Sequence, residues 1–267
     1  TALAMWIGER ITKNGIGNGV SLLIFAGIIS NLFNGIVLAF TDAVGITHYG
    51  TTIWQFLVII ISCLVITTLV TFVDMAERRI PVQYAKRVVG RKAYGGQSTY
   101  IPLKVIAVGV LPLIFAYSFM SFPGTIFAFF GPNSGVYKWW DTYMSQSSAL
   151  YLIVCAVLII LFSYFYTSIT FNPREIAENI QKQGGTINGR RPGKVTVDYL
   201  QRTSNRLTLF AALFLAVLAT VPTLLSVWNN VQIPFAASSI LIAVSVAIET
   251  VRQVEAQLVM RHYKGFL

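Results

Sequence analysis

The sequence predicts an all-α fold, a polytopic transmembrane helix bundle with about six membrane spans. Of its 267 residues, 55% are hydrophobic and only 11% are charged, whereas soluble domains carry roughly 25% charged residues. The mean hydropathy is +0.67. Apolar runs of the length that a bilayer requires, roughly 20 residues, recur along the chain. These observations exclude a single water-soluble core.

The predicted spans are separated by polar segments of unequal length. The six spans cover residues 20–40, 53–73, 105–122, 149–171, 207–225 and 234–251. Residues 1–7 are predicted to be the end of a helix whose beginning lies outside the chain, and residues 8–19 a short polar loop. The glycine run from Gly15 to Gly19 predicts a tight turn that launches a helix, because no Lys-Ser/Thr pair follows it as in a phosphate loop.

Prolines and glycines mark further local structure. Gly109 and Pro112 fall inside the third span, and Pro123 is predicted to close it. A proline within a membrane helix frees a carbonyl and bends the axis, so this helix is either a moving part or statically kinked. Pro173 predicts the first turn of a short helix that ends at two glycines. The sequence GRRPG at 189–193 predicts a turn that carries two arginines.

Positive charge is confined to one side of the predicted membrane. The formal net charge is +10, and 19 of the 20 Lys and Arg residues lie in the first loop, the two long polar segments 74–104 and 172–206, and the C-terminal tail. The opposite side holds only Lys138. The positive-inside rule therefore predicts that both ends of the chain and both long segments are cytoplasmic.

The sequence contains few groups that could support chemistry. No charged residue lies in the middle of a predicted span, and His48 and His262 both lie outside the spans. Cys63 and Cys155 lie in apolar runs, as buried small side chains do. No motif of a metalloprotease or serine hydrolase is present. We therefore predict no enzymatic activity, no metal and no cofactor.

Five motifs together carry a family resemblance. In chain order they are GIGNGVSLLIFAGI (15–28), ERRIPVQYAKR (77–87), QSTYIPLK (97–104), YTSITFNPREIAENI (166–180) and RRPG (190–193). This pattern resembles the SecY family, the central channel subunit of the bacterial Sec protein translocon, over essentially the whole chain. The resemblance implies a ten-helix, inverted-repeat channel, of which the six spans are helices five to ten. Residues 1–52 would then hold the end of helix four, a cytoplasmic turn and helix five, and residues 53–267 the second half.

The resemblance also implies a function. Such a channel translocates secretory polypeptides across the bacterial cytoplasmic membrane, inserts membrane proteins into it, and is driven by SecA or the ribosome. The implied partners are SecE, SecG, the SecA ATPase, the ribosome, the signal sequence or preprotein, membrane lipid, and the N-terminal half of SecY, which this chain would lack.

Particular residues match positions of the family's motifs. The resemblance implies a pore ring at Ile24, Ile114 and Ile242, where a bulky apolar collar seals against ions yet widens around a polypeptide. The third and fourth spans would form one wall of a lateral gate, with a hinge at Gly109 and Pro112. The implied docking surface for SecA or the ribosome comprises Arg78, Arg79, Lys86, Arg87, Arg91, Lys92, Arg190 and Arg191. Lys92 replaces a second arginine, which keeps the charge but loses bidentate pairing.

Three alternatives stay open. The basic residues could serve only to set topology. A small-solute transporter with inverted repeats would need a polar site at the midplane of the membrane, which the apolar spans argue against. A purely structural subunit predicts no effect of polar substitutions at Ile114 or Ile242, whereas a channel predicts ion leak or relaxed signal-sequence selectivity.

Overall fold

The computed structural model describes most of the chain. The described residues are 2–15, 18–44, 52–84, 87–89, 92–94, 98–106, 109–129, 134–145, 148–187, 189–229 and 236–263. They form two compact units, which we describe separately. The first comprises Thr1–Phe72 with Leu218–Leu267, and the second comprises Val73–Val217.

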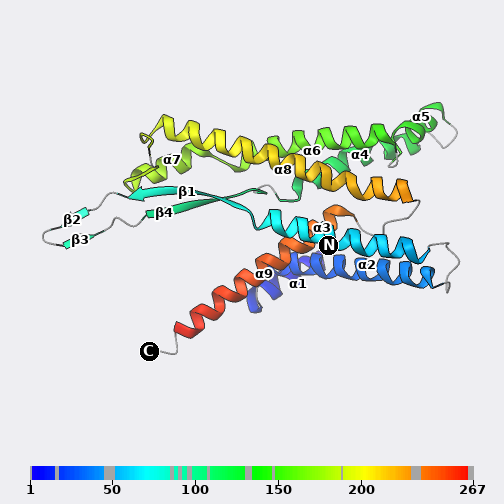
Figure 1. Ribbon diagram of the computed structural model, residues 1–267, viewed down its shortest axis with the longest axis horizontal. Helices are drawn as coiled ribbons and strands as arrows, with labels where there is room; N and C mark the ends of the chain where they lie inside the picture. Colours follow the sequence, from blue (N-terminus) through cyan, green and yellow to red (C-terminus); the bar gives the residue numbers. More distant parts are fainter. Residues whose placement is uncertain are drawn as a thin grey trace. The chain divides into compact units, whose positions relative to one another are not determined.

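The first unit is helical throughout its described part. It contains α1 (Ala2–Asn14), α2 (Gly19–Ala43), most of α3 (Ile53–Asp74), the end of α8 (Lys194–Asn229) from Leu218 onward, and α9 (Ala237–Tyr263). Helix α1 packs against α2, and α2 packs against α9. Figure 1 shows α2 and α3 as long, nearly unbroken helices.

The start of α2 confirms the helix that the glycine run predicted. The side-chain oxygen of Asn18 accepts a hydrogen bond from the backbone N–H of Val20 at 3.1 Å, which caps the helix. The N–H of Gly19 donates to Thr12 Oγ1 at 2.9 Å. A side chain at Gly19 would collide with the carbonyl of Gly8, so only glycine permits this close approach.

The predicted polar loop at residues 8–19 is wrong in its first half. Helix α1 continues to Asn14 through these polar residues. Trp6 and Arg10 lie one turn apart, and the guanidinium of Arg10 sits 5.4 Å from the ring centroid of Trp6. Polarity here marks the exposed surface of a helix rather than its end.

Among the described residues, four helices are long and apolar enough to cross a membrane, as expected of a multi-pass membrane protein. They span Gly19–Ala43, Ile53–Asp74, Ala149–Lys182 and Lys194–Ser226. The predicted spans 20–40, 53–73 and 149–171 are therefore confirmed within a few residues. The sixth prediction, 234–251, falls partly outside the described residues, and α9 is not among the four. From Glu249 onward, helix α9 carries charged residues, among them Arg252 and Glu255.

The third predicted span begins too early and ends too early. Helix α4 runs from Leu111 to Phe129. Gly109 precedes it in a turn with φ of +63°, and Pro112 lies in the first turn, where its missing N–H costs no hydrogen bond. Pro123 lies inside the helix instead of closing it. Helix α4 is apolar but shorter than the four candidate membrane spans.

Helices α4 and α6 form the core of the second unit's membrane part. Helix α6 (Ala149–Thr170) packs against α4. The ring of Phe162 lies between Phe115 and Phe119, with centroid distances of 5.9 and 6.3 Å. Aromatic pairs at such distances stabilise helix contacts beyond the area that they bury.

Two further helices of this unit occupy predicted loops. The segment 124–148 contains α5 (Gly135–Tyr143), whose Trp140 packs edge-on against Phe127 at 5.3 Å. The short helix after Asn172 is α7 (Pro173–Lys182), with Pro173 in its first turn as predicted. Helix α8 (Lys194–Asn229) contains the fifth predicted span, 207–225, which is confirmed, and begins before it at Lys194.

The two long polar segments contain strands, so the all-α prediction is confirmed for the membrane part but incomplete for the polar part. Strands β1 (Glu77–Tyr84) and β4 (Ser98–Lys104) pair antiparallel, and β5 (Gly185–Ile187) adds to the other edge of β1. Strands β2 (Arg87–Val89) and β3 (Lys92–Tyr94) form a separate pair. The resulting ribbon is visible in Figure 1.

The register of β1 and β4 accommodates two prolines. Pro81 pairs with Tyr100, and Pro102 pairs with Arg79. These two pairs lie two residues apart along β1, so they are of the same type, either both hydrogen-bonded or both non-hydrogen-bonded. Antiparallel pairs alternate between hydrogen-bonded and non-hydrogen-bonded. The alternate pairs, such as Ile80 with Ile101, can therefore carry the ladder although proline has no N–H.

A hydrophobic cluster joins the two polar segments beneath the sheet. Its buried members are Ile80, Val82, Ala177, Ile180, Ile187 and Leu200. They come from β1 in the first polar segment and from α7, β5 and α8 in the second. We call this set the sheet cluster. It makes the polar part of the second unit a packed layer rather than two independent loops.

Candidate docking surface and channel positions

The predicted docking residues lie on different elements of the second unit. Arg78 and Arg79 are exposed on β1, and Arg190 and Arg191 are exposed at the turn between β5 and α8. Arg87 lies in β2 and Lys92 in β3. The other two predictions, Lys86 and Arg91, lie outside the described residues. The structure therefore places four of the eight side chains on the exposed surface of the sheet and its neighbouring turn.

Arg79 has partners within the sheet. Its Nε donates to Glu77 Oε1 at 2.7 Å, and its guanidinium lies 4.9 Å from the ring centroid of Tyr100 on β4. The hydrogen bond that Arg79 donates to the Glu77 carboxylate raises the pKa of Arg79. The charge of Arg79 is therefore partly balanced before any partner binds.

Two glycines with positive φ and two hydrogen bonds to the backbone stabilise the RRPG turn. Gly189 and Gly193 have φ values of +74° and +103°, a region that favours glycine. The N–H of Arg190 donates to the carbonyl of Ile187 at 3.0 Å. The buried hydroxyl of Thr196 donates to the carbonyl of Arg191 at 3.0 Å. The turn is thus closed by hydrogen bonds on both sides of the arginine pair.

The sequence analysis missed the residue under this turn. The guanidinium of Arg190 lies 3.9 Å from the ring centroid of Tyr199, in the first two turns of α8. Tyr199 also packs against the sheet cluster. The sequence analysis also missed strand β1, although the alternation of Ile80 and Val82 in ERRIPVQY indicates a strand.

The predicted pore-ring residues lie on three helices. Ile24 on α2 and Ile114 on α4 are 49% and 44% exposed, so neither side chain belongs to the packed interior. Ile242 on α9 is half-buried, next to the buried Leu241. Ile24 and Ile242 belong to the first unit and Ile114 to the second. The ring itself stays a prediction.

The predicted hinge residues lie at the beginning of α4 rather than within it. Gly109 adopts a left-handed turn, and a Cβ at this position would meet no atom within 4 Å. Pro112 is buried in the first turn of α4. Any bending at these residues would therefore reorient the whole of α4 instead of kinking it.

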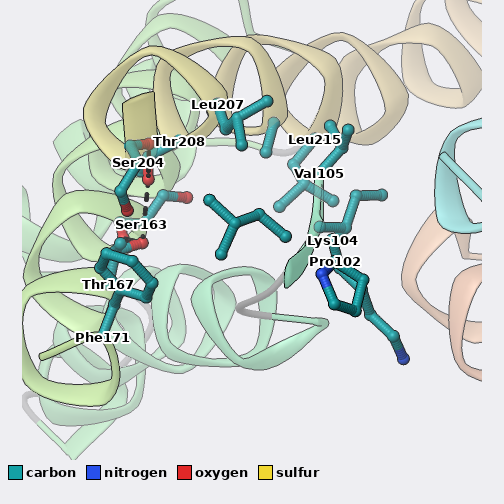
Figure 2. Close-up of a pocket in the computed structure, with 13 residues that line it drawn as sticks. Pro102, Lys104, Val105, Ser163, Thr167, Phe171, Ser204, Leu207, Thr208 and Leu215 are labelled. Carbon is teal, nitrogen blue, oxygen red and sulfur yellow. Dashed lines mark hydrogen bonds between the residues drawn. The ribbon is translucent and has the colours of Figure 1, made fainter. Parts of the chain in front are cut away.

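A cavity of about 320 Å³ lies between α6, α8 and the end of β4. Figure 2 shows four hydroxyl side chains, Ser163, Thr167, Ser204 and Thr208, grouped at one end of it. The hydroxyl oxygens of Thr167 and Thr208 lie 3.3 Å apart and join the two helices.

Three of these four hydroxyls, those of Ser163, Thr167 and Thr208, donate to carbonyls of their own helices. Ser163 donates to the carbonyl of Ile159 at 2.7 Å, and Thr167 donates to the carbonyl of Ser163 at 2.8 Å. Small hydroxyl residues allow membrane helices to approach closely and bond across their interface. The arrangement therefore supports helix association rather than catalysis. Among the described residues, no group of three His, Cys, Asp or Glu side chains could hold a metal ion.

Comparison with known proteins identifies the family. A model of the SecY family matches residues 1–251. The chain belongs to the SecY family. The protein translocase subunit SecY of Halalkalibacterium halodurans is 45% identical over 273 residues, which cover 100% of this chain and 63% of that relative. The chain thus spans less than two thirds of the length of this SecY relative.

Solved structures support the same fold. One, described as showing that the plug domain of SecY stabilises the closed state of the translocation channel, matches with a TM-score of 0.66 and 21% identity. Another, described as a protein-conducting channel, also matches with a TM-score of 0.66, at 20% identity. They cover 97% of this chain and 64% and 63% of theirs, respectively. The SecY fold of this chain therefore rests on both sequence and structure.

Proposed function

We propose that this SecY-family chain supplies helices five to ten of a protein-conducting channel, through which secretory polypeptides cross the membrane and membrane proteins enter it. The observation that carries the proposal is the 45% identity, over the whole chain, to a protein named as a translocase subunit. The one-sided distribution of 19 basic residues supports a bacterial cytoplasmic membrane with both ends of this chain in the cytoplasm.

The proposed pore ring consists of Ile24, Ile114 and Ile242. The exposure of Ile24 and Ile114 supports this role, because a lining side chain cannot also be buried in the interior of its own unit. An aliphatic collar excludes ions by desolvation yet offers no fixed polar group to an extended polypeptide. Such a ring suits a passage for chains of any sequence.

The proposed lateral gate has α4 and α6 as one wall. Their aromatic contact through Phe162 supports movement of the two helices as one body. Gly109 and Pro112 would form the hinge, because the turn before α4 has a left-handed glycine that absorbs a change in direction.

The proposed partners divide between membrane and cytoplasm. SecE, SecG and lipid would contact the spans, and the SecA ATPase or the ribosome would dock on the basic surface. The exposed arginines of β1 and of the RRPG turn support docking, because both partners present anionic groups to it. The signal sequence would enter at the gate.

The test is photo-crosslinking from position 114 in the full-length channel, with a stalled secretory polypeptide. Leu113 is the matched control, because it is adjacent in α4 but fully buried. We expect position 114, but not 113, to crosslink to the polypeptide only when its signal sequence is intact. In a complex that translocates, equal crosslinking from both positions, or none from 114, would overturn the assignment of Ile114 to the pore.

A further inference from the structure

Arg190 is held in place by an aromatic ring that is itself anchored. The ring centroid of Tyr199 lies 3.9 Å from the guanidinium carbon, which is a close stacking distance. Tyr199 packs against the sheet cluster, and its neighbour Leu200 is fully buried. The ring therefore has little freedom to move away from the arginine.

The backbone on either side of Arg190 is fixed as well. Its N–H is bonded to Ile187 of β5, and the following residue, Arg191, is bonded through its carbonyl to Thr196. Thr196 is only 3% exposed. Most of the conformational freedom of an exposed arginine has therefore been lost before a partner binds.

A stacked guanidinium keeps its hydrogen-bonding capacity. The ring occupies one face of the planar group, whereas the five N–H donors point outward in its plane. This fork matches two oxygens of a phosphate or carboxylate. Ordering the side chain in advance reduces the entropy lost on binding.

The charge around the turn favours phosphate. Between residues 185 and 206 five exposed cations face a single exposed carboxylate, Asp198. The cations are Arg190, Arg191, Lys194, Arg202 and Arg206. The uniformly charged backbone of RNA fits such a surface better than the mixed charges of a protein do. Arg79 differs from Arg190, because its Nε already donates to Glu77.

We propose that Arg190 is a pre-positioned fork for an RNA phosphate of the docked ribosome, and that Tyr199 is its positioning residue. The proposal rests on the docking function proposed above.

The experiment uses the full-length channel with its partner subunits in phosphatidylcholine vesicles, and non-translating bacterial ribosomes as the probe. Binding is measured by flotation across a salt series. We expect Tyr199→Leu, which keeps an apolar side chain but removes the ring, to weaken binding about fivefold. Tyr199→Phe, which keeps the ring, should bind like the parent. Tyr143→Leu on α5, an exposed tyrosine of the opposite polar segment, is the matched control and should have no effect.

The salt series separates charge from positioning. Arg190→Ala should lower the slope of log affinity against log salt by about one, because one phosphate contact is lost. Arg190→Lys and Tyr199→Leu should weaken binding but keep the slope, because the positive charge remains. The double variant Arg190→Ala with Tyr199→Leu should bind no more weakly than Arg190→Ala alone.

Three results would overturn the proposal in distinguishable ways. If Arg190→Ala weakens binding and Tyr199→Leu does not, Tyr199 is not a positioning residue. If the variants weaken binding of SecA but not of ribosomes, the fork binds a protein carboxylate and the RNA assignment is wrong. If Arg190→Ala, Arg191→Ala and Arg78→Ala all leave the binding of SecA and of ribosomes unchanged, the docking function itself is wrong.

Discussion

The two basic segments carry the same number of Lys and Arg residues, seven each, yet hold them differently. In the segment 74–104, β1 and β4 form a ribbon, and beyond Tyr84 the described strands β2 and β3 pair only with each other. In the segment 172–206, a short turn lies directly over the sheet cluster. The described arginines of the first segment lie on strands, whereas Arg190 and Arg191 of the second lie on a turn that an aromatic ring supports.

The difference shows that charge count does not describe a docking surface. Ordering a segment when a partner binds costs conformational entropy. A turn fixed by two glycines, a threonine and a tyrosine has lost that entropy during folding. We therefore expect the second segment to be more sensitive to substitutions beneath its surface, and the first to substitutions on it.

The largest expected effect comes from removing the shared core. Leu200→Ala deletes a fully buried side chain of the sheet cluster, and we expect a loss of about 3 kcal/mol of local stability. Hydrogen exchange should then accelerate at Val82 and Ile187 while the helices α2 and α3 stay protected. Leu209→Ala, on the same helix but 51% exposed, is the control. Equal effects of the two variants would show that the sheet cluster is not a cooperative core.

An intermediate effect should follow from straining the turn alone. Gly189→Ala places a Cβ at φ of +74° where no atom lies within 4 Å, so its cost is purely that of the backbone. We expect about 1 kcal/mol of destabilisation, measured as faster exchange of the Arg190 amide. Gly135→Ala is the control, because its surroundings are also open and its φ is not positive. Unchanged protection at Arg190 would mean that the turn is not conformationally restricted.

The smallest effect is expected on the ribbon. Glu77→Gln removes the carboxylate that bonds Arg79, an exposed pair whose attraction is screened by water and salt. We expect no measurable change in the thermal midpoint of the channel but tighter ribosome binding at low salt, since Arg79 gains freedom to contact a partner. Glu175→Gln, a charge-matched change at an exposed residue of α7, is the control. A drop in thermal midpoint would show that the pair supports the strand.

The membrane helices were the predictable part of this fold, because hydropathy reports what lies in hydrocarbon. The boundaries of α2, α3 and α6 followed from their apolar runs. The same measure predicted the fifth span at 207–225 but not the earlier part of α8, which begins at Lys194 in polar sequence. Hydropathy locates the membrane rather than the ends of a helix.

The sheet and the candidate site depended on contacts that no local pattern contains. The alternation of Ile80 and Val82 in ERRIPVQY indicates a strand but not its partner β5, which lies about 100 residues later. Tyr199 is nine residues from Arg190, across a turn, so helical spacing does not predict their stacking. The motif resemblance named Arg190 and Arg191 as docking residues, but only the structure distinguishes how each is held.

The course of α8 through the second unit has a mechanical consequence. Tyr199 supports the RRPG turn, Thr208 is hydrogen-bonded to Thr167 of α6, and Ala211 packs in a second buried cluster with Val73 and Ile106. Twelve residues of unbroken helix, about 18 Å, separate Tyr199 from Ala211. A load applied to the turn would therefore reach α6 along a stiff helix, without passing through a flexible linker. A push or pull from a docked partner would displace α6, because α8 would bend little under the force.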